Sequence, residues 1–190
     1  LGFYEGNTTV VVNGLVGVGV TQIPPLLERD FDIPMDPALT LWITAAVFFH
    51  AWGVLGWPGT SGNFYGSIPW WDHFTHGLSA SVVAAVGYAT ARALDIHSPD
   101  IHLPRRFMFV FILLFVLAFG VMWEVIEFGL GELARWQGNR ALLTQHGLDD
   151  TMLDLVFDSV GAVIVATWGT VHLADISGYI ADSIAARTSD

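Results

Sequence analysis

Five apolar stretches, each long enough to cross a lipid bilayer as a helix, constrain this sequence more than any other feature. A hydrocarbon core of about 30 Å needs roughly 20 apolar residues per helix. The stretches cover approximately residues 8–27, 37–57, 70–94, 106–130 and 150–173. They predict an all-α fold: a polytopic membrane helical bundle with five transmembrane helices, forming one domain over residues 1–190.

The composition also indicates a membrane protein. Hydrophobic residues make up 53% of the chain and charged residues only 13%, whereas soluble domains carry about 25% charged residues. The mean hydropathy is +0.55. We therefore interpret the five stretches as membrane crossings rather than as buried helices of a soluble core.

The charge and the missing residue types exclude several functions. The net charge is −11, with 18 acidic residues against 7 basic ones, and all seven basic residues are arginine. An acidic chain without lysine suits very high salt, so we expect a halophilic, archaeal-like source and no nucleic-acid partner. The absence of cysteine excludes disulfides and cysteine-ligated metals. The absence of lysine excludes a Schiff base with retinal or pyridoxal phosphate.

Prolines and the chain ends suggest where elements stop. Pro24-Pro25 is predicted to end the first helix, and Pro58 the second. The chain begins with Leu1 rather than Met, which leaves room for upstream residues such as a signal or a further helix. Apolar residues of the tail 174–190 repeat at helical spacing: Ile176, Tyr179, Ile180 and Ile184. This repeat predicts an amphipathic helix that lies in the membrane interface or packs on the bundle.

The arginines predict the orientation in the membrane. Cytoplasmic loops of membrane proteins carry an excess of Lys and Arg. One side of the predicted topology has five arginines: Arg29, Arg92, Arg105, Arg106 and Arg187. The opposite side has two, Arg135 and Arg140. We therefore expect a multi-pass protein of the plasma membrane with a cytoplasmic C-terminus.

Ionisable residues inside the apolar stretches are the candidate functional residues, because charge at membrane depth is costly and rare. They occur at helical spacings that place each set on one helix face. The three sets are Asp72 with His76, Glu124 with Glu127, and Asp150 with Asp154 and Asp158.

Helix polarity predicts that these three sets meet. The second and fourth stretches end on the side of the membrane where the third and fifth begin, so all three sets lie in the outer half. Several carboxylates buried together need protons or a cation. We expect a divalent metal ion: imidazole with carboxylate suits zinc, iron or manganese, and carboxylate alone suits magnesium or calcium. The expected ligands are Asp72, His76, Glu124, Glu127 and Asp154, with Asp150 and Asp158 as rim and floor.

Structural roles compete with this interpretation at several positions. Asp149 and Asp150 open a helix and are candidate N-caps, as is Asp72. His73 is expected to point away from the face of Asp72 and to lie at the interface. His50, a lone histidine on an apolar helix, is expected to be a hydrogen-bonded core residue. Glu124 and Glu127 are not expected to be caps, because a helix C-terminus disfavours negative charge.

Three motifs resemble the YjdF-like family of prokaryotic membrane proteins and, more distantly, the VanZ-like proteins. They are Trp70-Trp71-Asp72-x-x-x-His76, Trp123-Glu124-x-x-Glu127-Phe128, and Gly147-Leu148-Asp149-Asp150-Thr151-Met152-x-Asp154-Leu155 followed by Gly161. The similarity spans about residues 21–170. The resemblance implies a small helical bundle in the plasma membrane without a settled activity. It supports the candidate ligands and Asp149, whereas position 158 is more often Asn in the family.

Three classes of function fit these features. The first is a metal-binding protein that acts as a metal-dependent hydrolase on a lipid or envelope substrate. The second is a non-enzymatic subunit or scaffold, with protein partners in a membrane complex. The third is a proton or ion transporter, although the inner halves of the helices carry few ionisable groups. A haem or carotenoid carrier, with His50 and His76 as haem ligands, is a fourth idea that nothing in the sequence requires.

Overall fold

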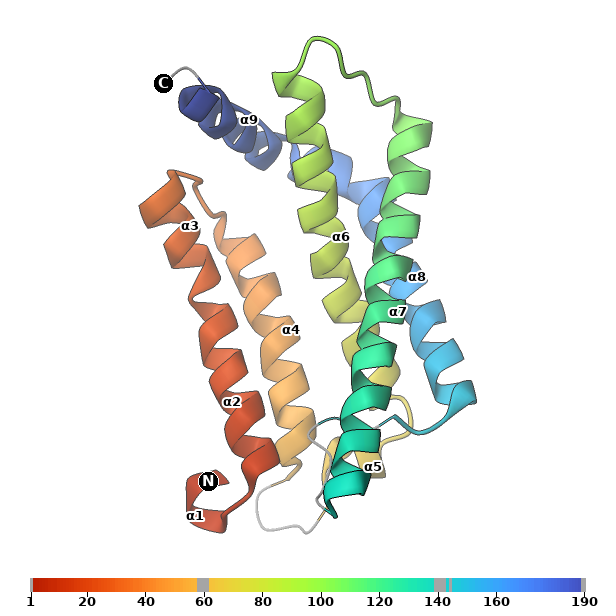
Figure 1. Cartoon of the computed structure of the whole chain (residues 1–190). Coiled ribbons are helices and arrows are strands. Elements are labelled where there is room, and N and C mark those ends of the chain that lie inside the picture. Colours follow the sequence, from red (N-terminus) through yellow and green to blue (C-terminus); the bar gives the residue numbers. More distant parts are fainter. Residues whose placement is uncertain (1, 58–61, 139–142, 144, 189–190) are drawn as a thin grey trace.

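A computed structural model describes residues 2–57, 62–138, 143 and 145–188, and all regular secondary structure in this part of the chain is helical (Figure 1). The helices are α1 (Gly2–Glu5), α2 (Thr8–Thr21), α3 (Ile23–Phe31), α4 (Pro37–Leu55), α5 (Phe64–Ser67), α6 (Trp71–His97), α7 (Arg105–Gln137), α8 (Leu148–His172) and α9 (Ala174–Thr188).

Five segments are long and apolar enough to cross a membrane, which confirms the predicted all-α polytopic bundle. They are Thr8–Phe31, Pro37–Leu55, Trp71–His97, Arg105–Gln137 and Leu148–Gly169. The ends of α4 and α7 lie at the same end of the bundle as the beginnings of α6 and α8 (Figure 1). This is the helix polarity that the sequence predicts. We call this end of the bundle the site end.

The prediction that Pro24-Pro25 ends the first crossing is wrong. Helix α2 ends at Thr21, and after Gln22 the chain continues as α3, whose first turn contains both prolines. The first turn of a helix tolerates proline because its N–H groups have no partner within the helix. The segment therefore ends at Phe31, where Asp32 adopts a left-handed conformation with φ of 54°.

Other boundaries differ less from the prediction. Helix α4 ends at Leu55, and Pro58 lies outside the described residues. Helix α7 continues to Gln137 rather than ending near residue 130, because no proline interrupts it before Gly138 ends it with a φ of 68°. Glu124 and Glu127 consequently lie well inside α7, too far from its C-terminus to act as caps.

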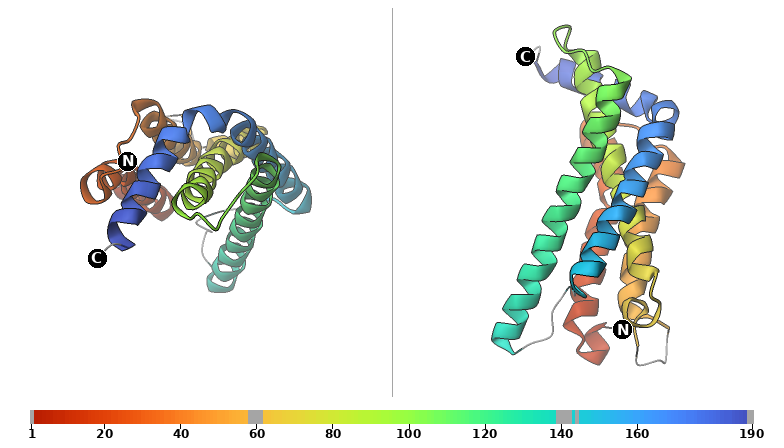
Figure 2. Two further views of the ribbon diagram at one scale, coloured as in Figure 1. Left: turned by 90° about the horizontal axis from the view of Figure 1, so that it is seen from above. Right: turned by 90° about the vertical axis from the view of Figure 1, so that its right-hand side faces the viewer.

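Helix α6 is the centre of the bundle and contacts α4, α7, α8 and α9 (Figures 1 and 2). Its closest neighbour is α8, and glycines permit the approach. A Cβ atom on Gly77 would lie 3.2 Å from the carbonyl oxygen of Phe157, and one on Gly161 would meet the carbonyl oxygen of Gly77. The backbones of α6 and α8 are therefore in direct contact one turn away from the candidate ligands.

The hairpin of α2 and α4 packs on α6 through α4. The Trp42 indole N–H donates to the Ser81 hydroxyl over 3.0 Å. At the site end, aromatic rings from α4, α5 and α6 pack on one another, with Phe64 and Trp71 at a centroid distance of 4.7 Å. Phe64 and Trp71 are both buried. This aromatic cluster fixes the beginning of α6, where Asp72 and His73 lie.

The tail helix α9 packs on the bundle, which is the second of the two predicted alternatives. It crosses the end opposite the site end, against α6 (Figure 2). Ile176, Ser177 and Ala181 are buried, and Ile180 packs against the core. Tyr179 is 47% exposed on the other face. The helical repeat of the tail therefore predicted the buried face except at Tyr179.

The contact between α6 and α8 predicts that Gly161→Ala lowers stability. The added methyl group would meet backbone atoms rather than a flexible side chain, and overpacking of this kind costs about 1–3 kcal/mol. Thermal unfolding in detergent measures the effect. Gly129→Ala is the matched control in α7, because no atom lies within 4 Å of its added Cβ. A Gly161→Ala protein that melts at or above the wild-type temperature would contradict the close contact.

Candidate functional site

The candidate site lies between the N-terminal halves of α6 and α8, at the site end. The structure brings together Asp72 and His76 of α6 with Asp150, Asp154 and Asp158 of α8. Asp154 is 1% exposed and Asp158 is 4% exposed. The α6–α8 backbone contact therefore places two fully buried carboxylates of α8 against the histidines of α6.

His76 is the residue that contacts most of the carboxylates. Its Nε2 atom lies 3.8 Å from Asp72 Oδ1 and 4.0 Å from Asp154 Oδ2. Its Nδ1 atom lies 3.4 Å from Asp158 Oδ1. The two ring nitrogens thus face different carboxylates, with Asp158 on one side and Asp72 with Asp154 on the other.

The expectation that His73 lies off this face at the interface is wrong. Its Nδ1 atom is 2.7 Å from Asp154 Oδ1, and its side chain is 14% exposed. The ring stacks on Phe157 with a centroid distance of 5.4 Å. His73 precedes His76 by three residues, and residues at this spacing are neighbours on a helix surface. The i,i+3 relation to His76 was therefore a better guide to the position of His73 than its relation to Asp72.

His146 also belongs to the site, although it was not among the predicted site residues. Its Nδ1 atom lies 3.5 Å from Asp150 Oδ2, and its backbone N–H donates to the same oxygen over 3.1 Å. His146 precedes Asp150 by four residues, just before α8 begins. That spacing is visible in the sequence, but the residue lies outside the apolar stretches from which the candidates were drawn.

The three aspartates suggested as N-caps do not cap. Helix α8 begins at Leu148, and Gly147, with φ of 111°, occupies the cap position. Asp149 and Asp150 lie in the first turn, and no side chain caps the helix. Asp72 likewise lies in the first turn of α6, whose cap position is Trp70. Neither carboxylate therefore occupies an N-cap position, although that of Asp150 accepts the backbone N–H of His146 just before α8.

The site residues form three overlapping groups, each with side-chain N or O atoms that all lie within 4.8 Å of one another. The groups are Asp72 with His76 and Asp154, Asp72 with His146 and Asp150, and His73 with Asp150 and Asp154. Every aspartate in these groups belongs to two of them, and every group contains one histidine. We call these six residues the His/Asp cluster.

Glu124 and Glu127 lie on α7 and belong to none of these groups. The Thr151 hydroxyl donates to Glu124 Oε2 over 2.6 Å, and the Gln145 amide lies 3.4 Å from the same oxygen. The Trp123 indole N–H donates to Glu127 Oε1 over 2.9 Å. The five residues expected to form one ligand set are thus placed as three on α6 and α8 and two on α7. Helical spacing shows which face of a helix is polar but not how far that face lies from the next helix.

Glu124 is 5% exposed, and its Oε1 atom has no hydrogen-bond partner among the described residues. Its Oε2 atom is the acceptor for Thr151 and Gln145. The Gln145 amide also donates to the Thr151 hydroxyl over 2.9 Å. Hydrogen bonds to a buried carboxylate are strong because the charge would otherwise be left without water. Thr151 therefore links α8 to α7 beside the His/Asp cluster.

Hydrogen bonds join His50 of α4 to Asn13 of α2 and to Tyr65 of α5. The His50 Nε2 atom lies 3.0 Å from Asn13 Oδ1, and its Nδ1 atom lies 2.8 Å from the Tyr65 hydroxyl. Because Asn13 Oδ1 is an acceptor, Nε2 carries the proton and Nδ1 accepts from Tyr65. Burial raises the pKa of Tyr65, so the phenol stays protonated as this donor. The expectation that His50 is hydrogen-bonded in the bundle is therefore confirmed.

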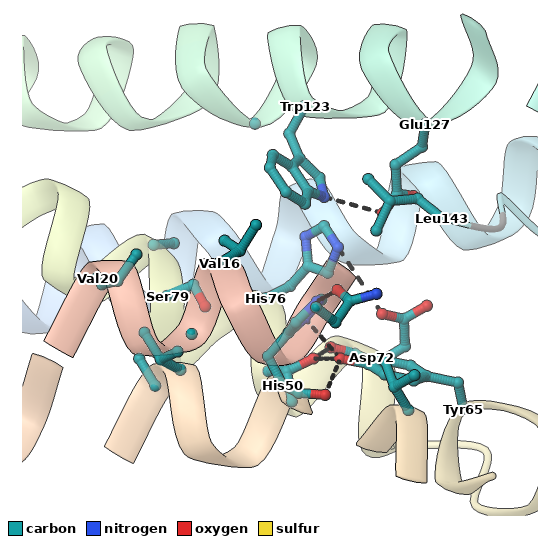
Figure 3. Close-up of a pocket in the computed structure, with 18 of the residues that line it drawn as sticks. Val16, Val20, His50, Tyr65, Asp72, His76, Ser79, Trp123, Glu127 and Leu143 are labelled. Carbon is teal, nitrogen blue, oxygen red and sulfur yellow. Dashed lines mark hydrogen bonds and ion pairs between the residues drawn. The ribbon is translucent and has the colours of Figure 1, made fainter. Parts of the chain in front are cut away.

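A cavity of about 490 Å³ adjoins the site between α2, α4, α6 and α7. Asp72, His76 and Glu127 point into one end of it, together with His50 and Tyr65 (Figure 3). Ligand pockets of proteins typically measure about 300–1,000 Å³. Three members of the His/Asp cluster, Asp72, His76 and His146, thus line a cavity of ligand size.

The Thr151 contact predicts a cost for Thr151→Val, which keeps the shape of the side chain and removes the hydroxyl. Depriving a buried acceptor of its donor costs about 1–3 kcal/mol, so the variant should melt below wild type in detergent. Thr167→Val is the control, because the exposed Thr167 hydroxyl donates to carbonyl groups of its own helix. Equal losses in the two variants would show that the Glu124 contact contributes nothing specific.

Comparison with known proteins agrees with a membrane protein family. No solved structure matches the chain. An uncharacterized protein of Thermotoga maritima is 31% identical over 126 residues, which cover 66% of this chain and 58% of that protein. The chain therefore spans less than two thirds of the length of this relative. Its partial match and undescribed function leave the activity to be argued from the site.

The family profile described as predicted membrane protein (DUF2238) matches residues 1–175. This match agrees with the resemblance to a YjdF-like family of unsettled function, and it includes all of the His/Asp cluster and both glutamates of α7. The chain belongs to the DUF2238 family of predicted membrane proteins.

Proposed function

We propose that this membrane protein binds a divalent metal ion at Asp72, His76 and Asp154 and uses it to hydrolyse a lipid or envelope substrate. The observation that carries the proposal is the arrangement around His76. Its Nε2 atom faces Asp72 and Asp154, while its Nδ1 atom lies 3.4 Å from Asp158. Metal-binding histidines commonly donate their second ring N–H to a carboxylate, which fixes the tautomer and orients the ring.

Charge supports the same assignment. Asp72, Asp150, Asp154 and Asp158 lie close together, and Asp154 and Asp158 are almost fully buried. Their mutual repulsion and loss of water are costly unless positive charge compensates. A divalent ion beside His76 supplies it. Imidazole with carboxylate ligands favours zinc, iron or manganese over calcium and magnesium, which prefer oxygen ligands.

The neighbouring groups supply the remaining functions of a hydrolytic site. A bound metal ion polarises an ester or phosphoryl oxygen and makes a bound water more acidic. His73 contacts Asp154 Oδ1 at 2.7 Å, whereas His76 faces the other carboxylate oxygen, Oδ2. Asp150 belongs to two groups without contacting His76, which leaves its carboxylate as the candidate general base. Trp52, Trp70 and Trp71 pack together at the site end, and tryptophans are enriched where lipid headgroups meet the bilayer, which supports a lipid substrate.

Metal binding is tested on protein that has been purified, stripped with a chelator, dialysed against zinc or manganese and analysed by plasma mass spectrometry. Wild type should retain metal, and Asp154→Asn should lose it. Asp100→Asn replaces an exposed carboxylate in the loop between α6 and α7, at the other end of the bundle, and should bind like wild type. Wild-type protein that retains no metal would refute the proposal.

The role of Asp158 separates ligand from supporting residue. Asp158→Leu removes the acceptor for His76 Nδ1 and should weaken metal binding by about 10–100-fold, the usual effect of losing such a partner. Asp158→Asn keeps a carbonyl oxygen at the same place and should retain most of the affinity. Titration calorimetry of both variants measures the difference. Equal affinities of Asp158→Leu and wild type would show that Asp158 does not orient His76.

Hydrolysis is tested by incubating the zinc- or manganese-loaded protein with ester-linked and phosphate-linked lipids in mixed micelles and detecting products by mass spectrometry. Turnover should cease after chelation and return when the metal is restored. Asp150→Asn should reduce it by about 10²–10⁴-fold, the typical contribution of a general base, while metal binding persists. Activity that survives both chelation and Asp150→Asn would contradict this mechanism.

A further inference from the structure

The cavity beside the His/Asp cluster is elongated along the helices. On α2 its lining runs from Thr9 to Val20, and on α6 from Asp72 to Val83. Each range covers a rise of about 16 Å at 1.5 Å per residue. The hydrocarbon core of a bilayer is about 30 Å thick. The cavity therefore extends over about half of the core, the depth that one lipid chain occupies in one leaflet.

The lining changes from polar to apolar along this length. The end near the His/Asp cluster has His50, Tyr65, Asp72, His76 and Glu127, whereas Val16, Val20 and Ser79 line the part away from these residues (Figure 3). Val83, Val116 and Phe119 complete the apolar part. A ligand that satisfies both ends has a polar head and a single apolar chain.

The charges of the lining restrict the head. Three carboxylates line the cavity, those of Asp72, Glu127 and Asp158, and no arginine is among its lining residues. In the absence of a bound metal ion, an anionic head would meet these three carboxylates and the lining histidines, with no arginine to balance its charge. A hydroxyl group, in contrast, donates to a carboxylate, and hydroxyl and ester oxygens accept from imidazole N–H and phenol O–H groups, without charge repulsion. The cavity therefore favours an uncharged head.

We propose that the cavity binds a single-chain lipid with an uncharged hydroxyl or ester head, of the monoacylglycerol type. The chain lies between α2 and α7, and the head faces Asp72 and His76. This inference rests on the proposed function in that it names the substrate class of the same site. Binding of the chain itself involves only apolar walls and needs no metal.

The position of the chain is tested by photo-crosslinking purified protein with a monoacylglycerol that carries a diazirine in its acyl chain. Labelled peptides should come from the cavity faces of α2 and α7. Val16→Trp places an indole in the cavity and should lower labelling several-fold. Val18→Trp is the matched control, because Val18 is about as exposed as Val16, 63% against 59%, but does not line the cavity. Val20→Trp repeats the test deeper in the cavity, and melting temperatures confirm that the variants are folded.

The outcomes separate this inference from the metal proposal. Labelling that persists after chelation and falls in Val16→Trp supports the chain site even if no metal binds. Labelling that is equal in Val16→Trp and Val18→Trp, or that lies on the outer surface of the bundle, overturns it. Competition on chelated protein tests the head: unlabelled monoacylglycerol should compete better than lysophosphatidic acid with the same chain. Equal or stronger competition by the phosphate-headed lipid would overturn the assignment of an uncharged head.

Discussion

The direct backbone contact between α6 and α8 determines most of what the site end can do. At Gly77 and Gly161 the two helices approach without intervening side chains. This close approach lets His73 reach Asp154 and His76 reach Asp158. A wider spacing between the helices would leave these carboxylates without a histidine partner. Small residues at helix interfaces are a general means of close packing in membranes, where apolar burial alone does not drive helices together. Here they also set the distances within the His/Asp cluster.

Much of the fold was predictable from the sequence, because length and hydropathy determine which segments can span a bilayer. Helix polarity alone also predicted that Asp72, His76 and Asp154 lie at one end of the bundle. The rest depended on quantities that periodicity does not contain. His73 faces Asp154 because of how α6 is rotated about its axis relative to α8. Glu124 contacts Thr151 instead of the cluster because of the distance between α7 and α8. His146 was missed because it belongs to a loop whose path no pattern predicts.

Helix α7 has a different relation to the site from that of α6 and α8. Its two glutamates accept hydrogen bonds from Thr151 and Trp123 and take no part in the three groups of the cluster. Farther along, Gly120 leaves space for the Asp158 carboxylate, since a Cβ atom there would meet Asp158 Oδ2. Helix α7 therefore accommodates the Asp158 carboxylate and closes one side of the cavity, while its own carboxylates accept from neutral donors.

The placement of the cavity wall on α2 and α7 has a consequence for how such a protein can diversify. The residues that shape the far end of the cavity, such as Val16 and Val20, have no contact with the His/Asp cluster in the described interactions. A mutation there changes the width or depth available to a bound molecule without moving a carboxylate or an imidazole. Changes on α6 or α8, in contrast, alter both helices' shared backbone contact. If the cavity holds a substrate as proposed, the walls contributed by α2 and α7 can therefore change its selectivity while the His/Asp cluster stays intact.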